Sequence, residues 1–370
     1  MKKKWVILLV LAAAVVLMAG CKKQAEGAFI GIAMPETGRW RWDKDGNSLK
    51  AEAEKRGYRA EVQYGEVDQP TQNQQIQNFL DQGAKLLVVG CIDDSVDLVI
   101  SVAAHNNVTV IAYDRIIASS ENYDYYITFN NFKVGVYQAQ SLVDALELDS
   151  ASADEPKQIA LFAGSSTDGN AFFFFDGAMS VLNPYIESGV LNVVGPYPKT
   201  STDTANFQRI AIENWQESIA KTHMEDLLAG AARNVTLDAI LSPNDKLARA
   251  FIEACKADAK YQDKLPLVTG QDAEFDSAVM IKSGEQYSTV FKDTAKLAEA
   301  TILLADAILK DQPPNIPGAV LAEGDLKEIG NTGRKYVNTY LLDPILVTKE
   351  NLNVPVDAGF YEADEVPLLK

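Results

Sequence analysis

The sequence has few of the residues on which metal centres, nucleophilic catalysis and disulfide scaffolds depend. Its 370 residues include 3 cysteines and 2 histidines, and no Cys/His spacing typical of a metal site is present. Neither a G-x-S-x-G elbow nor a P-loop occurs. His105 and His223 lie in polar, helix-like stretches and are interpreted as surface residues. The sequence therefore predicts no enzyme, no catalytic residue, no cofactor and no metal.

Positive charge is also scarce. Lys and Arg number 34 against 51 Asp and Glu, which gives a formal net charge of −17. No basic stripe offsets this balance, so a nucleic-acid partner is excluded. The 47% hydrophobic and 23% charged content is that of a globular protein with large cores, and the length allows two or three domains.

A long apolar run occurs only at the start, in "MKKKWVILLVLAAAVVLMAGC". The lysines, the apolar stretch and the small residues before Cys21 predict a secretory signal over residues 1–20. "LMAGC" resembles a bacterial lipobox, in which the cysteine is acylated, and residues 21–27 then form a polar tether. The alternatives are an ordinary cleaved signal and an N-terminal transmembrane anchor. We expect an exported protein, periplasmic or at the cell surface, held to the membrane by a lipid on Cys21.

The other two cysteines lie far apart in the chain. Cys91 ends a predicted strand of the first half, and Cys255 lies in a helical pattern of the second. Pairing is an alternative in an exported protein. We favour two free thiols, because distant cysteines cannot be bridged without backbone movement.

Strand-like and helix-like segments alternate after the tether. This rhythm predicts an α/β fold with two doubly wound parallel sheets, Rossmann-like lobes joined by a multi-stranded hinge. The predicted N-terminal lobe covers 28–131 plus about 292–325, and the C-terminal lobe covers 132–291 plus about 326–370. Among the expected helices, one begins with Asp43 as its cap, and one runs from Phe207 to Ala229.

Polar residues follow the predicted strands at the points where the strands end. In parallel sheets, ligands bind beyond the carboxyl ends of the strands. A solvated turn explains one such residue but not the whole set. The strand ends carry Arg41 and Trp42, Asp114 and Arg115, Asp168 and Asn170, Asn244 and Asp245, Gln271 and Asp272, and Lys292 and Asp293.

These side chains mix donors and acceptors, as the hydroxyl groups of a sugar require. The cations among the candidates are Arg41, Arg115 and Lys292, and the anions are Asp114, Asp168 and Asp272. Their charges balance, which favours a neutral polyol over a phosphate or a dicarboxylate. Trp42, Trp215 and the phenylalanines of "FFFF" could offer ring faces to a pyranose, although Phe173 and Phe174 are interpreted as helix core.

Longer blocks carry a resemblance to a known family. "GIAMP", "AYDR", "FNNFKVGVYQA", "NAFFFFDGAMSVLNPYI", "TGQDAE", "GEQYSTVFKDT" and "DPILVTKEN" resemble the type I periplasmic sugar-binding proteins of ABC transporters, closest to the xylose-binding and multiple-monosaccharide-binding group. The resemblance implies a two-lobe receptor that closes on an aldopyranose such as xylose, glucose, galactose or arabinose. The ligand contacts that it implies are Arg41, Trp42, Asp114, Arg115, Asp168, Asn170, Trp215, Asn244, Asp272 and Lys292.

The resemblance also implies partners. The expected partner is an ABC permease in the membrane, and the receptor is expected to act as a monomer. A sugar-sensing role through a chemoreceptor or sensor kinase is the alternative, as is a ligand such as an autoinducer furanoside or a nucleoside. Two departures bear on the ligand: Gly169 stands where the xylose type has Asn, and Asn244 stands where the multiple-sugar type has Tyr.

Overall fold

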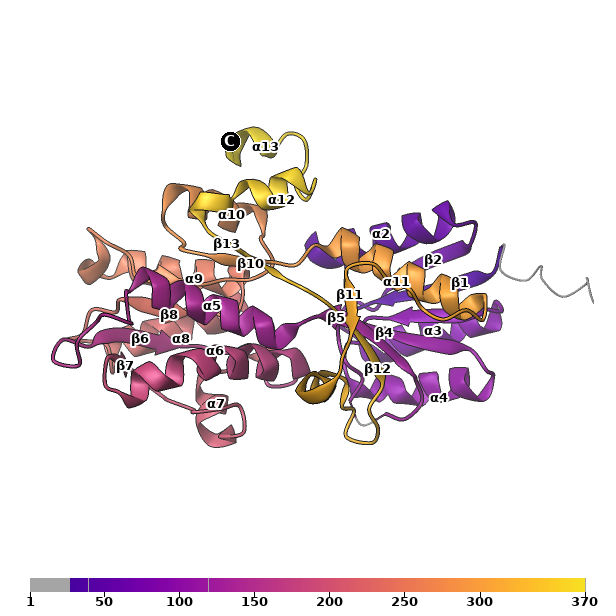
Figure 1. Ribbon diagram of the computed structural model, residues 1–370, viewed down its shortest axis with the longest axis horizontal. Coiled ribbons are helices and arrows are strands. Elements are labelled where there is room, and N and C mark those ends of the chain that lie inside the picture. The colour runs from indigo at the N-terminus through magenta and orange to yellow at the C-terminus, as the bar shows by residue number, and fades with distance from the viewer. Residues whose placement is uncertain (1–26, 39, 119, 370) are drawn as a thin grey trace, which may run out of the picture. The chain divides into compact units, whose positions relative to one another are not determined.

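A computed structural model describes residues 27–38, 40–118 and 120–369 of the chain (Figure 1). The predicted signal, Cys21 and all of the tether except Gly27 lie outside the described residues. By its contacts the chain divides into two compact units, and the first comprises residues up to Ile111 together with Ala298–Pro317. The second comprises Ala112–Leu297 and the remainder from Gly318. The predicted lobes, which assign residues 112–131 to the first half, stay a prediction.

Unit 1 is built from strands and helices that alternate along the chain. Its elements are β1 (Phe29–Met34), α2 (Trp40–Lys55), β2 (Arg59–Tyr64), α3 (Gln69–Asp81), β3 (Leu86–Val89), η1 (Asp94–Val96) and α4 (Asp97–His105). The unit boundary falls inside β4 (Thr109–Tyr113) and inside α11 (Thr294–Leu309). β1 and β3 are buried along their whole length, as strands covered on both faces should be.

Unit 2 repeats the alternation and adds a C-terminal segment. From β5 to β9 its elements are β5 (Tyr125–Phe129), α5 (Asn131–Ala145), β6 (Lys157–Leu161), α6 (Gly169–Glu187), β7 (Leu191–Val193), α7 (Thr204–Ile210), η2 (Glu213–Trp215), α8 (Glu217–Ala229), β8 (Ala239–Leu241), α9 (Asp245–Ala257), η3 (Ala259–Tyr261) and β9 (Leu267–Val268). The later elements are α10 (Phe275–Ser283), β10 (Thr289–Phe291), β11 (Ala319–Leu321), η4 (Gly324–Gly330), β12 (Asn338–Leu342), β13 (Ile345–Val347), η5 (Lys349–Asn351), α12 (Asn353–Asp357) and α13 (Val366–Leu369).

The strand pairing confirms the predicted parallel α/β class. Among the described residues, one sheet has the order β11-β12-β5-β4-β3-β1-β2 and another the order β7-β6-β8-β9. The β6, β7, β8 and β9 pairs are all parallel, with Ile159 opposite both Val193 and Ala239. β10 and β13 form a separate antiparallel pair in which Phe291 faces Ile345. The carboxyl ends of β6, β8 and β9 therefore meet at one edge.

Two predicted helices differ from the structure. The helix expected over Phe207–Ala229 is broken, because α7 ends at Ile210 and α8 begins at Glu217. Asn214 and Trp215 lie in the break with φ of 52° and 55°, which no helix accommodates. The first helix begins at Trp40, so Asp43 lies in its first turn rather than at its cap, where the carboxylate accepts the Gly38 N–H at 3.0 Å.

Cys91 and Cys255 are buried and form no disulfide with each other, as predicted. Burial raises the pKa of the Cys255 thiol to about 12, so this group stays protonated and unreactive at ordinary pH.

In the part of the chain that the structure describes, every helix is too short or too polar to cross a membrane.

α5 and α6 pack with their backbones in direct contact (Figure 1). A Cβ added at Gly135 would lie 1.8 Å from the Phe174 carbonyl oxygen. A Cβ at Gly177 would lie 2.0 Å from the Phe132 carbonyl oxygen. Each helix therefore uses a glycine where the other approaches most closely, and no larger residue fits without separating them.

We expect Gly135→Ala to destabilise the protein by about 1–3 kcal/mol through this backbone clash. The better helix propensity of alanine, about 1 kcal/mol, opposes the loss only in part. Urea unfolding measures the change, and Gln140→Ala on the exposed face of the same helix is the control, expected within about 0.5 kcal/mol of the native chain. Equal stability of the two variants would show that the helices can separate at no cost.

Candidate functional site

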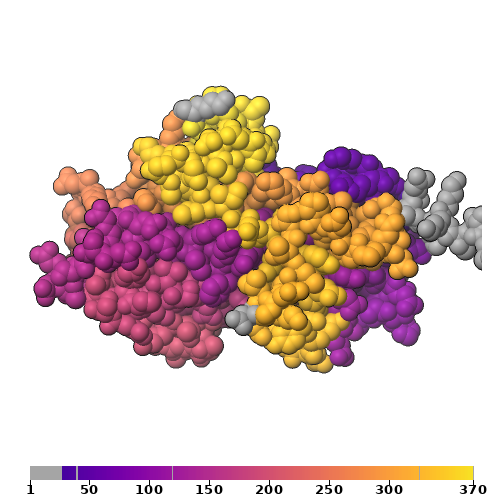
Figure 2. Space-filling model, in the orientation of Figure 1, coloured from indigo at the N-terminus to yellow at the C-terminus, as the bar shows by residue number. Residues whose placement is uncertain are grey.

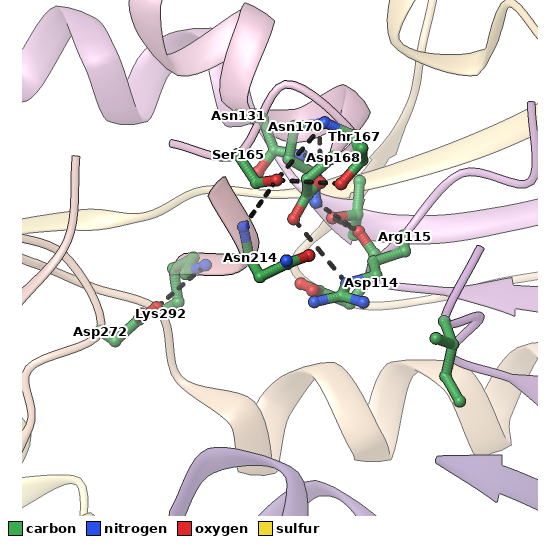
Figure 3. A network of polar contacts seen from close by, with 12 residues as sticks. Asp114, Arg115, Asn131, Ser165, Thr167, Asp168, Asn170, Asn214, Asp272 and Lys292 are labelled. Atoms are coloured by element: carbon green, nitrogen blue, oxygen red, sulfur yellow. Dashed lines mark hydrogen bonds and ion pairs between the residues drawn. The ribbon is translucent and has the colours of Figure 1, made fainter. Parts of the chain in front are cut away.

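Eight of the ten predicted ligand residues lie in unit 2, and the contacts below join several of them into clusters (Figure 3). They come from the turn after β4, the start of α6, the break between α7 and α8, the start of α9, the loop after β9 and the end of β10. These residues are Asp114, Arg115, Asp168, Asn170, Trp215, Asn244, Asp272 and Lys292.

Asp114 occupies a tight turn directly after β4. Its φ is 60°, a left-handed conformation that few residues other than Gly, Asn and Asp adopt, and the Arg115 N–H donates to the Tyr113 carbonyl at 2.6 Å. The Asp114 carbonyl oxygen accepts three hydrogen bonds: from the Tyr126 hydroxyl at 2.9 Å, the Thr128 hydroxyl at 3.1 Å and the Asn170 amide at 2.9 Å. These bonds fix the backbone from which the buried Asp114 side chain projects.

Arg115 and Asp168 form an ion pair at the start of α6. Arg115 Nε lies 3.8 Å from Asp168 Oδ2, and both side chains keep some exposure, 18% and 13%. The Asp168 carboxylate also caps α6, because it accepts the Asn170 N–H at 3.0 Å. The pair thus joins the turn after β4 to the first turn of α6.

Asn170 acts mainly as a link between elements. Besides its bond to Asp114, its carboxamide oxygen accepts from the Asn131 amide at 2.7 Å and from the Tyr126 hydroxyl at 3.3 Å. The side chain is 5% exposed. One amide hydrogen is left for a ligand, so the prediction that Asn170 binds one stays open while its positioning role is evident.

Asp272 and Lys292 form the second ion pair. Lys292 Nζ lies 3.0 Å from Asp272 Oδ1 and 5.6 Å from the centre of the Phe174 ring. Lys292 is 3% exposed, whereas the Asp272 side chain is 14% exposed. A buried ammonium needs such a partner, and here the carboxylate and the ring face supply it.

Asn214 is not among the residues that the strand-end pattern predicts. Its backbone N–H donates to Ser165 Oγ at 3.1 Å, and its exposed side chain lies between Arg115 and the Asp272–Lys292 pair in the view of Figure 3. Asn214 occupies this position because the chain breaks between α7 and α8. The sequence pattern indicates a continuous helix there, so it does not predict the position.

Trp215 follows Asn214 and packs mostly into the core. Its indole covers Gly164, where an added Cβ would lie 2.1 Å from the ring. It is 7% exposed, and Phe162 and Phe174 belong to the same core cluster. The prediction that it stacks on a ligand rests on the small rim that stays open.

Asn244 caps α9 and is 9% exposed. Its carboxamide oxygen accepts the Leu247 N–H at 2.9 Å, so its amide hydrogens are the groups that can serve a ligand. Gln138 on α5 lies beneath this loop: its amide nitrogen is 3.2 Å, 3.3 Å and 3.0 Å from the carbonyl oxygens of Ser242, Pro243 and Gly270. Gln138 thus ties the loop of Asn244 to that of Asp272, a role without any signal in the sequence.

The other two predicted residues, Arg41 and Trp42, lie in unit 1 on α2. Arg41 Nε is 3.6 Å from the buried Asp45 carboxylate, and its guanidinium lies 4.8 Å from the centre of the Trp42 ring. Trp42 is 2% exposed, so almost none of its ring is open as a stacking face. A ligand contact by either residue stays a prediction.

Asp245, the residue after Asn244, is a fully buried carboxylate that contacts the loop of Asp272. It accepts hydrogen bonds from Gln286, Thr289 and the Glu274 N–H at 2.8–2.9 Å. Burial raises the pKa of Asp245 well above its ordinary value, and the carboxylates of Glu274 and Asp272 add to the rise. Burial also raises the pKa of Glu274. The Arg249 guanidinium, with a nitrogen 2.5 Å from Glu274 Oε2, opposes this rise.

A groove lies elsewhere in unit 2. A groove of about 740 Å³ is lined by residues that precede β9 and β10, among them Gln262, Leu265 and Tyr287. These positions are at the amino ends of the strands, whereas the candidate residues follow the carboxyl ends. Among the described residues, no group of three His, Cys, Asp or Glu could hold a metal ion. The groove and the candidate residues therefore lie at opposite ends of the strands.

Comparison with known proteins gives consistent matches. A family model described as a periplasmic binding protein domain matches residues 30–313. The multiple sugar-binding periplasmic receptor ChvE of Rhizobium radiobacter is 40% identical over 346 residues, 92% of this chain and 93% of that protein. The D-xylose-binding periplasmic protein of Escherichia coli K12 is 31% identical over 352 residues, 95% of this chain and 96% of that protein. A crystal structure of an ABC transporter solute binding protein from Clostridium phytofermentans, with bound β-D-glucose, has a TM-score of 0.80 and 33% identity, and covers 92% of this chain and 100% of its own.

The raised pKa of Asp245 has a consequence for stability. The stability that this group contributes is present in full below its ordinary pKa of 3.8 and is lost as pH rises through the raised folded value. We expect Asp245→Asn, which cannot titrate, to flatten the fall in Tm that begins as pH rises above the ordinary pKa of 3.8. The variant should also lower the free energy of unfolding by about 1–3 kcal/mol, and with it Tm at every pH, because its amide N–H would face the donors of Gln286 or Thr289. Thermal unfolding at several pH values measures both effects, and an unchanged slope would contradict the assignment.

Proposed function

The chain belongs to the periplasmic binding protein family, and from this premise we propose that it is an exported receptor that binds a monosaccharide for an ABC importer. As a member of this family it is a binding protein and not an enzyme. The proposal is supported by relatives whose names state sugar binding and by a structural neighbour that holds β-D-glucose.

The observation that carries the proposal is that each of the two candidate cations in unit 2 lies beside a candidate carboxylate. Arg115 lies beside Asp168, and Lys292 lies beside Asp272, at 3.8 Å and 3.0 Å. A phosphate or carboxylate ligand would meet two carboxylates along with the two cations, and like charges at contact distance are costly. A neutral sugar hydroxyl can accept from the cation and donate to the carboxylate of the same pair.

The aromatic and amide groups complete a polyol site. Asn214 adds a donor beside the ion pairs, Asn244 adds amide hydrogens at the start of α9, and the rim of Trp215 adds an apolar edge for the C–H groups of a pyranose. We propose an aldopyranose such as glucose or xylose as the ligand. Sensing through a chemoreceptor or kinase stays a prediction, since the described residues hold no observation that favours it over transport.

We propose further that Cys21 carries a lipid that anchors the receptor. The support is the sequence "LMAGC" at the end of the signal-like segment. More than one acyl chain gives stable membrane attachment, while the remainder of the chain folds as a globular protein.

Calorimetric titration tests the ligand class. We expect D-glucose or D-xylose to bind, and glucose 6-phosphate to bind at least about tenfold more weakly, because its charge meets Asp168 and Asp272. Tighter binding of the phosphate ester would overturn the charge argument.

Asp114→Asn locates the binding. Asparagine tolerates the left-handed turn, so the backbone is kept while the charge is removed. Loss of a hydrogen bond to a charged group should weaken sugar binding about ten- to a hundredfold. Asp203→Asn, at the cap of α7, is the matched control and should leave affinity unchanged. Native affinity in Asp114→Asn would place the site elsewhere.

The lipid is tested by Cys21→Ser in a bacterial host. The variant should leave the membrane fraction and keep its sugar affinity, whereas the native chain should stay with the membrane and carry an acyl mass by mass spectrometry. A processed Cys21→Ser protein that still pellets with membranes would refute the lipid anchor.

A further inference from the structure

Asp272 and Ala273 form the strained loop between β9 and α10. Their φ values are 94° and 50°, and neither residue is a glycine. Side chains disfavour this conformation, which persists only where surrounding contacts impose it. Because Asp272 holds Lys292 at the candidate site, whatever imposes the loop conformation also sets that ion pair.

Three backbone N–H groups of the loop are held by neighbouring elements of unit 2. The Asp272 N–H donates to the Val290 carbonyl at 2.9 Å, and the Ala273 N–H donates to Thr289 Oγ1 at 3.1 Å. The next N–H, of Glu274, donates to the Asp245 carboxylate at 2.9 Å. These bonds hold the loop from the side of β10 and α9.

The C-terminal segment, which runs from α12 to α13, supplies the fourth hydrogen bond that holds the loop. The Tyr361 hydroxyl donates to the Ala273 carbonyl at 2.9 Å, across 88 positions of sequence. Tyr361 is 6% exposed, and its ring meets Phe275 edge-on with centroids 5.9 Å apart. Burial raises the pKa of this hydroxyl far above its ordinary value, so it stays a donor at working pH.

Phe360, which precedes Tyr361, contacts the strand that leads to Lys292, the cation of the ion pair. Phe360 meets Phe291 edge-on at 4.7 Å, and Phe291 directly precedes Lys292. The segment is also fastened at its end, where Lys282 Nζ of α10 donates to the Leu368 carbonyl at 3.1 Å. Figure 1 shows α12 and α13 beside α10, and the segment forms a continuous yellow surface in Figure 2.

We propose that Phe360 and Tyr361 are positioning residues of the ligand site, which brace the two backbone segments that carry Asp272 and Lys292. The inference rests on the proposed sugar-binding function. Neither aromatic residue needs to touch the ligand. Tyr361 acts through the Ala273 carbonyl, which is buried and would lose its hydrogen bond without the hydroxyl, and Phe360 acts through Phe291.

Tyr361→Phe removes the hydroxyl and keeps the ring contacts. We expect it to weaken binding of D-glucose and D-xylose by about three- to tenfold in calorimetric titration of the full chain, the scale of one lost hydrogen bond. The matched control is Tyr336→Phe, which removes a hydroxyl that donates to Glu328 at 2.7 Å on an exposed side chain. The control should bind as the native chain does. Native affinity in Tyr361→Phe would overturn the proposal.

A double-mutant cycle separates positioning from general destabilisation. If Tyr361 acts through Asp272, the loss caused by Tyr361→Phe should shrink in an Asp272→Asn background. An equal loss in both backgrounds would mean that Tyr361 acts independently of Asp272, and would overturn the proposal.

Two further outcomes are distinguishable. A native chain that binds neither sugar refutes the proposed function, and the inference with it, before any variant is compared. If circular dichroism shows that Tyr361→Phe is unfolded, Phe360→Leu provides the same test, because it weakens the contact with Phe291 and keeps the Tyr361 hydroxyl. Unchanged affinity in folded Phe360→Leu would then overturn the proposal.

Discussion

The contact between α5 and α6 is the constraint on which the candidate site of unit 2 depends. Gly135 and Gly177 let the two backbones touch, and this approach fixes the distance between the helices more rigidly than side-chain packing can. With the spacing set, Asn131 in the first turn of α5 reaches Asn170 in the first turn of α6 at 2.7 Å. The same face of α5 carries Gln138 about two turns further on, opposite the loops that follow β8 and β9. One helix face therefore determines where several strand-end loops lie.

Much of this arrangement is visible in the sequence. The apolar runs that end at Tyr113 and Phe291 identify two strands, and the charged residues that follow identify their carboxyl ends. These signals are local, because burial on both faces demands an uninterrupted apolar run and a parallel sheet places its ends at a common edge. The ion pair of Asp272 and Lys292 joins the loop after β9 to the end of β10, although these two strands belong to different sheets.

What the sequence hides is set by contacts between distant segments. The stretch from Phe207 to Ala229 keeps a helical pattern, yet it breaks where Trp215 covers Gly164 and the Asn214 N–H bonds to Ser165. Tertiary contacts here override propensity. Gln138 is equally invisible, since a glutamine in a helix is ordinary and its importance comes from three carbonyl groups more than a hundred positions away. The burial of Trp42 likewise depends on packing that its position in the sequence does not reveal.

The bond from Tyr361 to Ala273 makes the loop of Asp272 depend on a residue that is synthesised 88 positions later. The residues of β9, α9 and β10 are all synthesised before Tyr361, whose hydroxyl donates to the Ala273 carbonyl. Closure of a contact across 88 positions is slow compared with formation of the local helices and strands. The loop of Asp272 is therefore completed late in folding, after the local helices and strands around it.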